Sequence, residues 1–351
     1  MNTVQLNNTL KHVVKAALCA ATLSVIAPIA FAQKAQTVNL YTTREPKLIQ
    51  PLIDDFSQKS GVKVNVAFFK DGMAERVKAE GGNSTADLLM TVDIGKTSEL
   101  VEMGLTQPVK NNVLDAAIPA GLRDANGQWF ALSLRDRVLY AGKNLKITEF
   151  QYEDLAKPEW KGKVCIRSGQ HPYNLGLIAA MIANNGEAQT EQWLRGVKSN
   201  LARKATGGDR DVARDILGGI CEIGLANAYY AGQMKSAPEG TDARKWGDAI
   251  SVVRPTFKKT NATFVNITAV SLAKSAPNKD NAIKLMEYLV SDQAQSIYAR
   301  INHEYPVKPG VAIDPLMTSF GPLRPDMNAI PEIVKNRQLA SKLVDRVGFD
   351  Q

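Results

Sequence analysis

The sequence has little of what most metal sites and many enzymes use. Its 351 residues include three cysteines and three histidines. It contains neither a Cys-x-x-Cys pair nor a His-Glu-x-x-His motif, which argues against the usual zinc sites. The nucleophile motif Gly-x-Ser-x-Gly and a Gly-x-Gly-x-x-Gly loop after a strand are also missing. The common enzyme signatures are therefore missing, and we expect no catalysis.

Long apolar runs are missing as well, except near the N-terminus. The uncharged run 16–32 follows two lysines and ends in an Ala-x-Ala motif, Ala30 to Ala32. This is the layout of a cleavable secretory signal peptide. A membrane anchor is the alternative, but the run is short for a spanning helix and contains Pro28. We predict that residues 1–32 are removed on export to the periplasm.

Charge of one sign is not concentrated anywhere in the chain. The formal net charge is +8, and lysines and arginines alternate with acidic residues instead of forming a basic stripe. This pattern is typical of a solvated mixed surface and not of a nucleic-acid interface. We expect a monomer that does not bind nucleic acid.

Two cysteines, Cys165 and Cys221, follow the predicted signal peptide. Each lies in a short apolar run typical of a strand. In an oxidising periplasm these runs favour a structural disulfide if the two strands are neighbours. Two free buried thiols are the alternative.

The remaining pattern alternates strands with helices and predicts an α/β fold with a largely parallel sheet. Its opening predicts a βαβαβ unit with strands at 38–41, 62–69 and 87–91 and helices at 46–60 and 72–80. A strand-rich stretch at 129–145 precedes a second series, with strands at 163–167 and 222–226 and helices at 175–184, 187–198 and 211–217. A β-like stretch at 261–273 and a long helix at 279–300 follow.

The return to strand character after two such series indicates two lobes with more than one crossing between them. We place the crossings near 132–138 and 264–270. The predicted N-terminal lobe comprises 33–132 and 268–310. The predicted C-terminal lobe comprises 133–267 and 311–351.

Tyrosine is the residue type with an unusual placement. Four of the nine tyrosines lie at the ends of predicted elements: Tyr41, Tyr173, Tyr229 and Tyr230. Ligands of open α/β sheets bind outside the carboxyl ends of the strands. A single tyrosine there is usually a packing residue. Two adjacent ones serve the same site only where a strand ends and the backbone turns, because neighbours in a strand face opposite ways.

Several segments resemble the periplasmic ferric-iron-binding proteins of ABC importers. They are NLYTTR (39–44), SLRDRV (133–138), RSGQHPYN (167–174), ANAYY (226–230) and FVNI (264–267). The resemblance runs from about Val38 to Pro309. It implies a two-lobed type II periplasmic binding protein fold, with an interlobe cleft and hinge strands. It also implies capture of Fe(III) and delivery to an inner-membrane ABC permease.

The resemblance further implies the metal ligands. Tyr173, Tyr229 and Tyr230 would form a half-site in one lobe, and Tyr41 would arrive from the other lobe on closure. Ferric ion is a hard acid that prefers anionic oxygen, and its charge favours the phenolate form of tyrosine. Asp93 is a weaker candidate ligand.

Of the four arginines in the segments that carry the resemblance, three are candidate site residues: Arg44, Arg135 and Arg137. Arg135 and Arg137 are two residues apart on a predicted strand and would share a face. They would offset the phenolate charge, or one of them or Arg44 would hold a small anion such as carbonate. Ordinary surface ion pairing is the alternative for these arginines.

An alternative function stays open, because one two-lobed fold hosts many ligands. The cleft would then bind an organic or oxyanion solute such as a polyamine or a phosphorylated small molecule.

Overall fold

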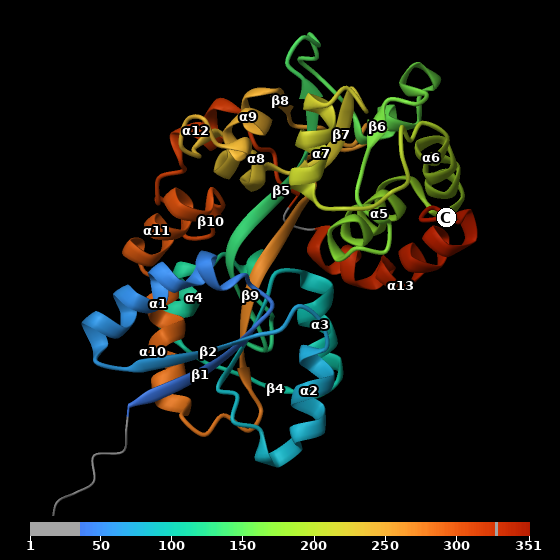
Figure 1. The fold of residues 1–351 in the computed structure, drawn as a ribbon. Helices are drawn as coiled ribbons and strands as arrows, with labels where there is room; N and C mark the ends of the chain where they lie inside the picture. The colour runs from blue at the N-terminus through green and yellow to red at the C-terminus, as the bar shows by residue number, and fades with distance from the viewer. Residues whose placement is uncertain (1–35, 327–328) are drawn as a thin grey trace, which may run out of the picture. The chain divides into compact units, whose positions relative to one another are not determined.

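The computed structural model describes residues 36–326 and 329–351 (Figure 1). The predicted signal peptide, 1–32, lies outside these residues. Within the described ranges, none of the helices has the length and apolar character needed to cross a bilayer.

The predicted βαβαβ opening is confirmed. It consists of β1 (Thr37–Thr42), α1 (Pro46–Ser60), β2 (Lys63–Phe68), α2 (Met73–Glu80) and β3 (Leu88–Thr91). Strand β1 lies between β2 and β3 and pairs in parallel with both. Helix α1 begins at Pro46, whose missing N–H costs nothing in a first turn, and ends at Ser60, where Gly61 caps the C-terminus with a φ of 70°.

Fifteen further α-helices and β-strands follow in the described residues, up to α11. They are α3 (Ile94–Glu102), β4 (Thr106–Gln107), α4 (Asn112–Ala117), β5 (Phe130–Gly142), β6 (Val164–Cys165), α5 (Pro172–Asn185), α6 (Glu187–Ser199), α7 (Asp209–Leu217), β7 (Ile223–Asn227), α8 (Ala228–Lys235), α9 (Asp242–Asp248), β8 (Ile250–Val253), β9 (Val265–Ala273), α10 (Lys279–Leu289) and α11 (Asp292–Asn302). Strand β10 (Tyr305–Pro306), α12 (Pro315–Ser319) and α13 (Ala329–Val347) complete the described elements.

The prediction of one long helix over 279–300 was wrong. The segment forms α10 and α11, separated at Val290 and Ser291. The Ser291 hydroxyl accepts the N–H of Ala294 at 3.2 Å and so starts a new helix.

Strand β5 joins two groups of strands in the order β2-β1-β3-β9-β5-β7-β6. Its first part, up to Asp136, pairs with β9, whereas Arg137 and the residues after it pair with β7 and β8. All of these pairings are antiparallel, as is β3 with β9. The sheet is therefore mixed and not largely parallel, because β5 and β9 run back through it.

The predicted lobe boundaries, 132/133 and 267/268, fall within β5 and β9. The change of pairing partners along β5 is compatible with a crossing there. The boundaries themselves stay a prediction.

The favoured disulfide between Cys165 and Cys221 is confirmed. The two Cα atoms are 5.8 Å apart. The bond ties β6, which pairs in parallel with β7, to the residue that leads into β7. Gly224 permits the close pairing, because a Cβ there would lie 2.3 Å from the carbonyl oxygen of Cys165.

The C-terminal helix α13 was not predicted from the sequence. It packs along α5 and also contacts α6 and α3 (Figure 1). Arg337 of α13 lies over Gly95 of α3, where a Cβ would be 2.4 Å from the arginine side chain. Helix α13 thus packs against α3 from the first α/β series of the chain and against α5 and α6 from the second.

Candidate metal site

A cavity of about 630 Å³ contains three of the four predicted tyrosine ligands, Tyr173, Tyr229 and Tyr230. The facing wall includes Arg44, Glu45 and other residues from the first half of the chain. A larger hollow of about 1050 Å³ lies beside α6, but no tyrosine lines it. The tyrosine-lined cavity is therefore the candidate site.

Two helix N-termini bring the three tyrosines together. Tyr173 is the second residue of α5, and Tyr229 and Tyr230 lie in the first turn of α8. The pair was predicted to close a strand, whereas β7 ends at Asn227 and the helix begins directly after it. The hydroxyl oxygens of Tyr173 and Tyr229 are 3.4 Å apart, and the ring centres of Tyr229 and Tyr230 are 4.1 Å apart.

The structure does not bring Tyr41 into this group. Its ring packs in a cluster with residues of α2, and its hydroxyl bonds Glu80 at 3.3 Å and Thr85 at 3.2 Å. Tyr41 is the second-last residue of β1, and its side chain lies on the face of the sheet covered by α2. Tyr41 was predicted as a ligand because the end of the first strand was expected to open into the cavity.

Burial sets the protonation of the tyrosine pair. It raises the pKa of Tyr229 well above its ordinary value of 10, and the neighbouring Tyr173 and Tyr230 add to this rise. Arg135 and Arg44 oppose it. Burial, followed by Tyr173, also raises the pKa of Tyr230. Both phenols are therefore protonated at neutral pH without a metal.

Arg44 and Arg135 are buried beside the tyrosines. Arg44 is held by an ion pair with Glu304, and its guanidinium carbon is 5.8 Å from the centre of the Tyr229 ring. Arg135 donates to the carbonyls of Val92 and Ile267 and lies 5.2 Å from the Tyr173 ring centre. Its Nε and Nη1 have no hydrogen-bond partner within the described part of the chain. These positive groups can compensate negative charge on the tyrosines.

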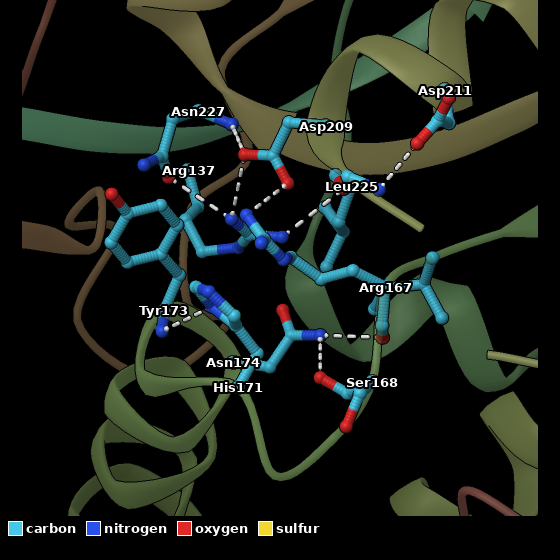
Figure 2. A network of polar contacts seen from close by, with 12 residues as sticks. Arg137, Arg167, Ser168, His171, Tyr173, Asn174, Asp209, Asp211, Leu225 and Asn227 are labelled. Atoms are coloured by element: carbon cyan, nitrogen blue, oxygen red, sulfur yellow. Dashed lines mark hydrogen bonds and ion pairs between the residues drawn. The ribbon is translucent and has the colours of Figure 1, made fainter. Parts of the chain in front are cut away.

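Arg137 is placed differently from Arg135. Its guanidinium pairs with Asp209 at 3.3 Å and donates to Asn227 at 3.0 Å and to the carbonyl of Leu225 at 3.1 Å (Figure 2). Neither Arg135 nor Arg137 is among the residues that line the cavity, but Arg137 also lacks a contact with the tyrosine rings of the described residues. The predicted role of Arg137 at the ligand is thus replaced by a role in a buried network behind it.

Asp93, the weaker ligand candidate, already has three partners. It accepts the N–H of Lys96 at 3.1 Å as the N-cap of α3 and the amide of Asn266 at 2.8 Å. It also pairs with Arg337 at 2.9 Å. These contacts explain its burial and leave it little capacity to bind a metal.

His171 positions Tyr173. Its Nδ1 accepts the N–H of Tyr173 at 3.2 Å, which caps α5. Burial and then Arg167 lower the pKa of His171 to about 3, so it stays neutral and keeps this acceptor. Within the described residues, no three His, Cys, Asp or Glu side chains group into a cation site. The phenols are thus the main ligand set that the cavity offers.

Three residues of the site or its surroundings were not predicted from the sequence: Arg167, Asp209 and Glu45. Arg167 belongs to the RSGQHPYN segment and lies 5.1 Å from the Tyr173 ring centre. Nothing in the sequence near Asp209 distinguishes it from the other carboxylates. Glu45 follows Arg44 directly and lines the cavity, so its position after β1 was an available signal.

The family model of bacterial extracellular solute-binding proteins matches residues 83–318. The chain belongs to this family. It is 64% identical to the solved Bordetella ferric binding protein, with a TM-score of 0.83 over 90% of this chain and 100% of that one. It is 36% identical to iron uptake protein A1 of Synechocystis sp., covering 90% of this chain and 88% of that protein.

A third relative was solved with its ligands. The chain is 39% identical to a Trichodesmium protein in complex with iron and citrate, with a TM-score of 0.82 over 89% of this chain and 99% of that one. These likenesses confirm the predicted two-lobed type II periplasmic binding protein fold.

Proposed function

We propose that this protein captures Fe(III) in the periplasm through the phenolates of Tyr173, Tyr229 and Tyr230 and delivers it to an inner-membrane ABC permease. The observation that carries the proposal is the convergence of three tyrosines on one cavity, with two hydroxyl oxygens 3.4 Å apart. Relatives named as ferric-binding and iron uptake proteins support the same ligand. The role requires no catalytic turnover.

The charge balance fits a trivalent cation. Three phenolates neutralise a 3+ ion, and the cation lowers the pKa of each bound phenol. Because the buried phenols are protonated without metal, binding releases protons and weakens as the pH falls. Arg44 lines the cavity and its Nε has no hydrogen-bond partner within the described residues, so it suits a small accompanying anion such as carbonate.

We propose Glu45 in place of Tyr41 as the donor from the facing wall. Its carboxylate is 40% exposed and lines the cavity, and within the described residues its one ion pair is a 3.5 Å contact to Lys47. An ionised carboxylate is a hard oxygen ligand of the kind Fe(III) prefers. A donor on each wall would let the metal favour a closed state, which a permease could distinguish from the empty protein.

The test is a visible absorption titration of metal-free protein with ferric citrate at neutral pH. We expect a broad phenolate-to-iron charge-transfer band that saturates at a single equivalent and is lost in a Tyr229→Phe, Tyr230→Phe double variant. Tyr288→Phe is the matched control, because Tyr288 bonds Asp55 and does not line the cavity. Absence of the band in folded wild-type protein would exclude the tyrosinate mechanism and favour an organic or oxyanion solute.

A further inference from the structure

A buried charge network lies behind the tyrosines, with Asp209 at its centre (Figure 2). Asp209 is the first residue of α7 and is 2% exposed. Its Oδ1 pairs with Nη1 of Arg167 at 3.2 Å. Its Oδ2 pairs with Nη1 of Arg137 at 3.3 Å and accepts the N–H of Asn227 at 2.8 Å. One carboxylate therefore fixes two guanidinium groups and one backbone amide.

The network reaches Tyr173 through Arg167. The guanidinium carbon of Arg167 lies 5.1 Å from the centre of the Tyr173 ring, and His171 and Tyr173 lie beside it in Figure 2. Arg167 is 13% exposed, and its Nε has no hydrogen-bond partner within the described residues. The ion pair with Asp209 is thus the contact that holds the guanidinium at this ring.

The network reaches the tyrosine pair through Asn227. This residue ends β7 and directly precedes α8, which carries both tyrosines in its first turn. Asp209 holds its N–H, Arg137 donates to its side chain, and the hydroxyl of Tyr140 donates to its carbonyl at 2.8 Å. Asn227, the junction between β7 and α8, is therefore fixed through its N–H, its side chain and its carbonyl.

The charges of the network also matter to the site. Arg137 and Arg167 carry two positive charges and Asp209 one negative charge, so one positive charge remains beside the tyrosines. Burial alone would raise the pKa of Asp209, but the two arginines and the Asn227 N–H outweigh it and lower the pKa. The carboxylate is ionised at neutral pH.

We infer that Asp209 is a positioning residue for iron binding, which sets the affinity and the colour of the ferric site through Arg167 and Asn227. This inference rests on the proposed function. Residues that orient metal ligands from behind change metal affinity by about ten- to a hundredfold when they are replaced. A residue that only stabilised the fold would change the denaturation midpoint and leave the charge-transfer energy unaltered.

The test compares Asp209→Asn with Asp211→Asn in the ferric citrate titration. Asp211 lies on the same helix but bonds Gly208 and Arg214, so it controls for loss of a carboxylate. In Asp209→Asn the guanidinium of Arg167 loses its anchor and can approach the phenolate of Tyr173. We expect a weaker Kd by about tenfold or more and a band shifted to shorter wavelength, because a stabilised phenolate gives up its electron less readily.

A band position and Kd equal to those of Asp211→Asn would overturn the inference while the wild-type band still supported iron binding. No band in wild-type protein would overturn the proposed function and the inference together. If Asp209→Asn does not fold, Arg167→Gln replaces it, because Asp209 then keeps Arg137 and Asn227. An unshifted band in folded Arg167→Gln would also overturn the inference.

Discussion

A tyrosine becomes a candidate ligand through the backbone that carries it. Tyr229 and Tyr230 could be predicted from the sequence because two adjacent side chains share a site only at a turn, and β7 does turn into α8 there. Tyr41 could not be placed in this way. The direction of the Tyr41 side chain depends on which face of β1 is covered by α2. The packing of α2 on β1 cannot be read from the residues around Tyr41.

Two substitutions decide whether Glu45 or Tyr41 donates to the metal from the first half of the chain. We expect Tyr41→Phe to leave the ferric charge-transfer band and Kd unchanged, because Tyr41 bonds Glu80 and Thr85 outside the cavity. Its cost should be about 1 kcal/mol in the free energy of unfolding, for the lost hydrogen bonds. Glu45→Gln should weaken Kd without loss of stability. A weaker Kd in Tyr41→Phe together with an unchanged Kd in Glu45→Gln would restore Tyr41 as the ligand.

Acid should destabilise the protein partly through His303. Burial lowers the pKa of His303 below its ordinary 6.5, against the attraction of Asp314. The folded state thus favours the neutral imidazole more than the unfolded state does. Neutral His303 therefore contributes its full share to the free energy of unfolding above pH 6.5. That share is lost as the pH falls below 6.5 toward the lowered pKa of the folded state. The replacement that tests this contribution is asparagine, because Asn tolerates the φ of 54° that the backbone has at His303.

We therefore expect the free energy of unfolding of His303→Asn to fall less steeply than that of the wild type between about pH 7 and 5.5. Urea denaturation at several pH values measures this slope. Parallel pH profiles would show that His303 does not titrate as its burial implies.

At the scale of elements, amphipathic helices and alternating strands were predictable because their signals are local. The buried residues Leu48, Ile49, Leu52, Ile53 and Phe56 define one face of α1. The break between α10 and α11 depends on a single serine cap within a continuous helical pattern. Pairing directions could not be predicted, since β5 and β9 find their partners across long stretches of sequence.

The disulfide should stabilise the elements it joins. It closes a loop with a sequence separation of 56, and both cysteines are buried. We expect Cys165→Ala, Cys221→Ala to lose about 2 to 4 kcal/mol in the free energy of unfolding, measured by urea denaturation. Wild-type protein unfolded and refolded in dithiothreitol should show the same loss. A midpoint that is insensitive to reductant would mean that the bond adds no net stability.

At the scale of the whole molecule, α13 packs on α3 as well as on α5 and α6. The Arg337–Asp93 pair lies at this junction, with Asp93 buried. We expect Arg337→Ala to cost about 1 to 3 kcal/mol in thermal or urea denaturation, because a buried carboxylate loses a charged partner. Asp93 keeps Lys96 and Asn266, so the variant should still fold.

Lys335→Ala is the control for this variant. Lys335 lies on the same helix, and its pair with Glu332 is largely exposed, so its loss should cost well under 1 kcal/mol. Equal stability of the two variants would show that the Arg337–Asp93 contact does not stabilise the junction.

The order of strands also has a consequence for biogenesis. Strand β3 pairs with β1 on one edge early in the chain, but its partner on the other edge, β9, is encoded far downstream, after β5 to β8. During synthesis from the N-terminus, β3 therefore presents an unpaired, apolar edge until β9 emerges. The nascent chain should depend on chaperones for that interval, and fragments that end before β9 should aggregate instead of forming a stable half.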